Sequence, residues 1–134
     1  MINDVLICKQ SELHGVDRLF SLPVRRLIPK EWQLTAAKAK YHTTAFSKIL
    51  NIPARQLLQQ CRRRFHCTTR TLLTHLQMLA AIELLQETAH GNEVSLRLGF
   101  RSLASFERRF KAHFGITTIE FVRRGGVLRG WGQN

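Results

Sequence analysis

The chain has 134 residues, enough for one domain or for two small lobes that share a connecting helix. Its 21 Lys and Arg against 9 Asp and Glu give a formal net charge of +12. Hydrophobic residues make up 44%, and Gly and Pro number only 8 and 3, which argues against a disordered basic tail. No run of about 18 apolar residues occurs, so a membrane span is excluded. A membrane is not among the partners that we favour.

The cysteines and the N-terminus bear on the cellular compartment. Cys8, Cys61 and Cys67 are odd in number and lack CxxC spacing, so neither a disulfide framework nor a zinc finger fits. The opening residues lack the basic-then-apolar order of a secretory signal. We therefore expect reduced thiols in a cytoplasmic protein. Residues 1–31 are an N-terminal extension of unknown role, either a short helix on the following lobe or the remnant of a longer protein.

Positive charge is concentrated in one stretch. Residues 32–82 hold eight basic side chains and no acidic one. The same residues contain periodic apolar positions, which indicates a folded surface built for a polyanion. Nucleic acid is the favoured partner, and a solubilising charge excess and a surface for anionic lipid are the alternatives.

Residues from about 43 to 66 are predicted to form a helix, a tight turn and a second helix. Asn51 tolerates the left-handed backbone that ends a helix, and Pro53 is expected at the first position of the next helix. The apolar face of that helix is expected to comprise Ala54, Leu57, Leu58, Cys61 and Phe65. The outward face is expected to comprise Arg55, Gln56, Gln59 and Arg63, with Arg62 beside them.

A long helix is predicted next, over about residues 69–88. The segment has no Gly or Pro, and Thr68 or Thr69 can cap its start. Its apolar residues spread over more than one face, so it should be buried on several sides and pack against both lobes. Roughly 19 helical residues at about 1.5 Å each span about 28 Å, close to the turn of about 34–36 Å in DNA.

Residues from about 92 to 114 are predicted to form a second helix-turn-helix, and residues 125–134 a flexible tail. Gly99 takes the place of Asn51 in the turn. On the second helix, one stripe holds Leu103, Phe106, Phe110 and Phe114. The opposite side holds Arg101, Ser105, Arg108 and Ala112, flanked by Arg109 and Lys111.

The two units align as an internal repeat. An offset of 48 pairs residues 46–52 with 94–100, and after one inserted residue an offset of 49 pairs 57–69 with 106–118. Apolar, turn and basic positions agree, which favours a duplicated unit over chance similarity. The sequence therefore predicts an all-α fold with two helix-turn-helix subdomains joined by a long linker helix. Arg and Gln fit guanine and adenine edges in the major groove, so the two outward faces are candidate DNA contacts.

These residues resemble the DNA-binding domain of the AraC/XylS family of bacterial transcription regulators, over about residues 32–124. The segment GFRSLASFERRFKAHFGITTIEF, residues 99–121, is similar to the most specific motif of that family. Ala81, Leu84 and Leu85 match the AxxLL of its linker helix. The chain departs from the family pattern at Pro53, Cys61, His66, Gly91, Ala104 and Thr118, which leaves the DNA sequence preference open.

The resemblance implies a sequence-specific regulator that inserts two helices into successive major-groove segments of double-stranded DNA. Base contacts are expected from Arg55, Gln56, Gln59, Ser105 and Arg108, and the family's base-reading positions also include Leu58, Leu103, Ala104 and Glu107. Phosphate contacts are expected from Thr43, Thr44, Arg62, Arg63, Arg101, Arg109 and Lys111. RNA polymerase is a candidate further partner. The chain is expected to be competent as a monomer, and a dimer stays open as an alternative if the chain is part of a longer protein.

No catalysis, cofactor or metal site is expected. The six His residues lack HExxH or CxxC partners, and no phosphate-binding Gly loop occurs. One alternative is a protein-interaction adaptor or anti-activator that uses the same fold and binds DNA weakly. Another is an RNA-binding protein, which would need exposed aromatic rings, whereas the eight Phe mostly occupy inward positions.

Overall fold

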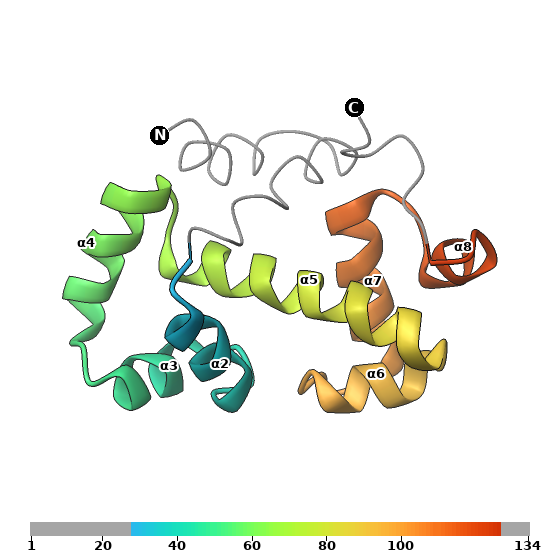
Figure 1. Cartoon of the computed structure of the whole chain (residues 1–134), viewed down its shortest axis with the longest axis horizontal. Helices are drawn as coiled ribbons and strands as arrows, with labels where there is room; N and C mark the ends of the chain where they lie inside the picture. The colour runs from blue at the N-terminus through green and yellow to red at the C-terminus, as the bar shows by residue number, and fades with distance from the viewer. Residues whose placement is uncertain (1–27, 127–134) are drawn as a thin grey trace.

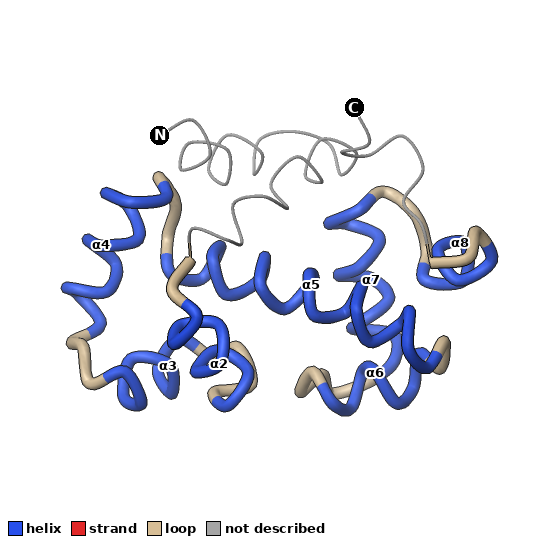
Figure 2. Tube along the Cα trace, viewed as in Figure 1, coloured by secondary structure: helices blue, strands red, loops and turns tan. Residues whose placement is uncertain are grey.

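A computed structural model describes residues 28–126. Within that range the chain is all-helical, as predicted, and has no strand (Figure 2). The helices are α2 (Lys30–Lys38), α3 (Thr43–Leu50), α4 (Ala54–Phe65), α5 (Thr69–Thr88), α6 (Gly91–Arg97), α7 (Leu103–Phe114) and α8 (Thr118–Arg123). They form two lobes at the two ends of α5 (Figure 1). The predictions for residues 1–27 and 127–134 lie outside the described part.

The first lobe packs α2, α3 and α4 against the N-terminal half of α5. Trp32 is its centre and meets Phe46 and Phe65 edge-on, with ring centroids 5.8 and 6.4 Å apart. The lobe begins before the predicted boundary at residue 32, because Ile28 is only 2% exposed and joins this core. The Ile28 carbonyl also accepts a hydrogen bond from Gln33 Nε2 at 2.9 Å.

The turn between α3 and α4 is short and follows the predicted chemistry. Asn51 ends α3 in the left-handed conformation, with φ 60° and ψ 38°. Two expectations were wrong by small margins. Pro53 is the N-cap of α4 and not its first helical residue, and Ala54 is exposed and not inward-facing. Both follow from the start of α4 at Ala54, because its first three residues lie on the surface and Leu57 is the first to enter the core.

The linker helix α5 contributes to both lobes. Thr68 caps its start by accepting a hydrogen bond from the Thr71 N–H at 3.1 Å. Its buried apolar residues divide along the chain: Leu72, Leu73 and Leu76 join the first core, and Met78, Ala81 and Leu85 join the second. The predicted burial on several sides is confirmed, so one rigid element belongs to both hydrophobic cores.

The second lobe is a phenylalanine core closed by a helix that the sequence did not predict. Phe110 lies 4.8–6.0 Å, ring centre to ring centre, from Phe106, Phe114 and Phe121. Phe121 belongs to α8, which starts at a capping box between Thr117 and Glu120. Leu103, expected on the inward stripe, is only half-buried, because it lies in the first turn of α7.

The chain stays packed into the start of the predicted tail. Gly126 is buried, and its carbonyl accepts a hydrogen bond from Gln86 Nε2 on α5 at 2.8 Å. The boundary expected at residue 125 was therefore too early.

Several contacts fix the lobes relative to each other. Tyr41, in the loop before α3, packs against both cores. Gln77 Nε2 on α5 donates a buried hydrogen bond to the Leu98 carbonyl at 3.1 Å. Gly99 has φ +86°, and a methyl group placed on it would lie 3.1 Å from Lys40 Cβ. The turn of the second lobe thus touches the loop of the first, so the fold resists independent movement of the lobes.

Candidate nucleic-acid interface

The helix α4 presents a basic and amide-rich face to solvent. Leu57, Cys61 and Phe65 anchor its other side in the core at 1% exposure or less. Cys61 belongs to the first core, and burial raises the pKa of its thiol, which disfavours the nucleophilic thiolate. The predicted contact residues of this helix are all exposed: Arg55, Gln56, Gln59, Arg62 and Arg63. No acidic side chain occurs on α4, so its surface attracts anions along its whole length.

The outward face of α7 is basic but carries smaller side chains. Ser102 caps the helix by accepting a hydrogen bond from the Ser105 N–H at 3.1 Å, which holds the half-buried Ser105 in the first turn. Four predicted phosphate or base contacts are exposed: Arg101, Arg108, Arg109 and Lys111. Ala104 and Ala112 are exposed between them, so α7 offers fewer long side chains to base edges than α4 does.

The first turn of α3 adds two exposed hydroxyls, those of Thr43 and Thr44. Its N-cap residue, His42, makes no side-chain capping hydrogen bond. The first backbone N–H groups of α3 therefore lack the usual side-chain cap, and the positive end of the helix dipole favours an anion there. This arrangement suits a phosphate oxygen.

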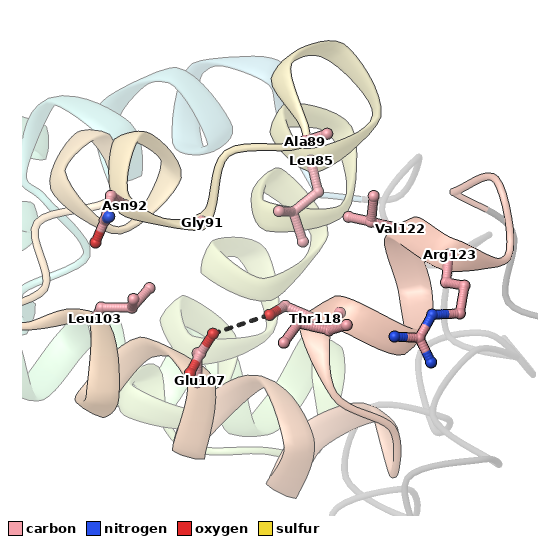
Figure 3. Close-up of a pocket in the computed structure, with 10 residues that line it drawn as sticks. Leu85, Ala89, Gly91, Asn92, Leu103, Glu107, Thr118, Val122 and Arg123 are labelled. Atoms are coloured by element: carbon pink, nitrogen blue, oxygen red, sulfur yellow. Dashed lines mark hydrogen bonds between the residues drawn. The ribbon is translucent and has the colours of Figure 1, made fainter.

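Two further residues at the family's base-reading positions point elsewhere. Leu103 and Glu107 line a pocket of about 430 Å³ together with residues of α5, α6 and α8. Figure 3 shows Glu107 turned toward α8, where its carboxylate accepts a hydrogen bond from Thr118 Oγ1 at 3.2 Å. Leu103 lies beside Gly91 of α6 and Glu107 faces α8, so both are half-buried and not centred on the outward face.

A basic groove of about 750 Å³ separates the lobes. The loop before α3 and the start of α3 form one wall, α5 forms the floor, and the turn before α7 and α7 itself form the other wall. Five cations and no Asp or Glu line it: Lys40, Arg70, Arg101, Arg108 and Arg109. Arg109 Nη1 crosses from α7 to donate a hydrogen bond to Thr74 Oγ1 on α5 at 3.2 Å.

Sequence reasoning missed two of these cations, Lys40 and Arg70. Both belong to the stretch without acidic residues, so their charge was visible in the sequence. Their position opposite α7 depends on how the lobes pack, which the pattern of residues within each helix does not encode.

The helix pairs, their turns and the linker now identify the family. A family model described as a helix-turn-helix domain matches residues 46–124, more than half of the chain. The chain belongs to the AraC-type helix-turn-helix family. This AraC-type protein is therefore, in general terms, a DNA-binding transcription regulator. No curated protein and no solved structure matches the chain.

Two other kinds of feature are absent from residues 28–126. No group of three or more His, Cys, Asp or Glu side chains is placed to hold a metal ion. None of the helices in this range combines the length and the apolar character that crossing a membrane would require.

Proposed function

We propose that this AraC-type protein binds double-stranded DNA sequence-specifically, with α4 and α7 in successive major-groove segments on one face of the duplex. The observation that carries the proposal is the shared linker. One helix belongs to both cores, and α4 and α7 lie at its opposite ends and run in the same sense in Figure 1. The 20 residues of α5 span about 30 Å, which is comparable to one turn of DNA.

Base recognition is assigned first to α4. Its exposed Arg55, Gln56 and Gln59 have the donors and acceptors that distinguish guanine and adenine in the major groove. On α7 the same role falls to Arg108, with Ser105 at its side. Because α7 carries exposed alanines between these residues, we expect its half-site to be read less stringently than that of α4.

Phosphate contacts fix the register of both helices. The proposed set combines exposed hydroxyls at the start of α3 with cations on the flanks of α4 and α7: Thr43, Thr44, Arg62, Arg63, Arg101, Arg109 and Lys111. With about 6–10 such contacts, affinity for duplex DNA should fall by about 10³–10⁵ between 50 and 200 mM salt. Binding that does not respond to salt would contradict the proposal.

Two comparisons separate this function from its rivals. Six phenylalanines are buried in the cores and are unavailable for base stacking, so we expect duplex DNA to bind more tightly than single-stranded RNA. A gel shift with and without unlabelled competitor duplex separates specific binding from the weak binding of an adaptor. We also propose that one chain suffices for binding, since both reading helices lie on it. Light scattering of the complex with duplex DNA measures the number of chains bound. RNA polymerase is proposed as a further partner in regulation.

A further inference from the structure

We propose that the groove between the lobes binds the sugar–phosphate backbone that lies between the two major-groove segments, with Arg70 and Lys40 as its phosphate-binding residues. The inference rests on the proposed DNA-binding function. It adds a third contact region, which the linker helix and the loop before α3 supply.

The charge of the groove indicates an anionic occupant. Five cations line a space of about 750 Å³, and no carboxylate lines it with them. Like charges gathered around one cavity repel one another, and a polyanion converts that repulsion into binding energy. The same groove also takes in Arg101, Arg108 and Arg109, which the proposed function assigns to the DNA contact at α7.

Arg70 occupies a position that is unfavourable without an anion. It is the second residue of α5, whose first turn holds no acidic side chain. A cation near the N-terminus of a helix opposes the helix dipole. Arg70 is exposed and contributes nothing to either core. Thr74, one turn further along α5, lies on the same side of the helix and accepts the hydrogen bond from Arg109.

Lys40 is held at the groove by an unusual backbone. Lys40 and Tyr41 both have positive φ angles, 54° and 61°, which non-glycine residues rarely adopt. The lysine stem lies against Gly99, whose missing side chain leaves room for it. This close approach places the side chain of a first-lobe residue against the second lobe, and Lys40 lines the groove there.

The geometry of DNA indicates which part of the duplex would lie in the groove. Two successive major-groove segments on one face of a duplex are separated by a minor groove and its phosphates. If α4 and α7 enter those segments, the backbone that borders the α7 segment passes between the lobes. The cations of the groove then lie opposite its phosphates.

The test compares charge-removing variants in the full chain. Arg70→Ala and Lys40→Gln are measured by fluorescence anisotropy on one duplex at several salt concentrations, with Arg123→Ala as a control that removes one charge from α8, outside the groove. Each lost phosphate contact should lower the slope of log affinity against log salt by about 0.9, which is about an eightfold loss at 0.1 M relative to 1 M salt. Arg70→Lys should retain most of the affinity. Since Arg70 opposes the helix dipole, Arg70→Ala should unfold no earlier than the wild type in urea.

The possible outcomes distinguish failure of the groove inference from failure of the proposed DNA-binding function. If the wild type shows no salt-dependent duplex binding, the proposed function fails. If the wild type binds and Arg70→Ala and Lys40→Gln match Arg123→Ala in affinity and slope, only the groove inference is overturned. A loss of affinity with an unchanged slope overturns it too. Calorimetry with inorganic phosphate tests a free-anion site: phosphate binding that Arg70→Ala abolishes while duplex binding stays intact would also refute it.

Discussion

Replacing Gly99 by alanine probes the contact that joins the two lobes. Gly99 has φ +86°, a conformation that costs an L-residue about 1–2 kcal/mol. The added methyl would also lie 3.1 Å from Lys40 Cβ, tighter than ordinary van der Waals contact. One methyl group forced into a filled site adds about 1 kcal/mol. We therefore expect Gly99→Ala to lower the free energy of unfolding by about 2–3 kcal/mol in total.

The matched control is Gly125→Ala. Gly125 has a similar φ of +79°, but nothing lies within 4 Å of the position of its missing methyl. Its substitution should cost only the backbone part, about 1–2 kcal/mol. Urea unfolding followed by circular dichroism gives both values, provided that the slope with denaturant stays the same.

A double-mutant cycle isolates the contact between the lobes. Lys40→Gly removes the atom that crowds the new methyl, so Gly99→Ala should cost about 1 kcal/mol less in the Lys40→Gly background than alone. Additive effects of the two substitutions would refute the close approach of Lys40 and Gly99. So would a Gly99→Ala variant that is as stable as Gly125→Ala.

Three further predictions concern base recognition, acid stability and thiol reactivity. Arg55→Ala and Arg108→Ala should each cost about 1–3 kcal/mol of binding and relax the preference at one base position, as measured by selection from a duplex pool; a uniform loss over all sequences would reassign the residue to phosphate. The Thr117 N–H holds the pKa of Glu120 below its usual value, so its stabilisation is present above that ordinary pKa and lost as the pH falls through the lowered one. Urea midpoints of Glu120→Gln should therefore fall less than those of the wild type between about pH 5 and about pH 3, and equal falls would exclude this role. The Cys61 thiol is buried and its pKa is raised, so a thiol reagent at neutral pH should modify it only after unfolding, as peptide mass spectrometry would show; rapid labelling in the native state would contradict its burial.

The parts of the fold that could be predicted are those set by local chemistry. A stretch without Gly or Pro after Thr68 predicted the linker helix, and its apolar residues on several faces predicted its burial in two cores. Asn51 and Gly99 marked the two turns because both tolerate positive φ. Thr117 and Glu120 have the spacing of a capping box, but the six residues of α8 are too few for a periodic pattern to predict a helix there.

The site was less predictable than the fold, since side-chain direction depends on tertiary contacts. Glu107 matched a base-reading position, but its partner Thr118 comes from the unpredicted α8 and draws the carboxylate toward that helix. Lys40 lies in the groove with a positive φ of 54°, which no pattern in the sequence predicts. The sequence showed Arg70 only as one of the cations of the stretch without acidic residues. The packing of the two lobes on α5 places it in the groove opposite α7.

Selection of bound sequences from a randomised duplex pool tests most directly whether both lobes engage DNA together. Rigid presentation of α4 and α7 by one shared helix predicts two half-sites whose centres are about 10 base pairs apart, at a constant spacing. The half-site of α7 should tolerate more bases than that of α4. A single short enriched site, or two sites at variable spacing, would contradict the account.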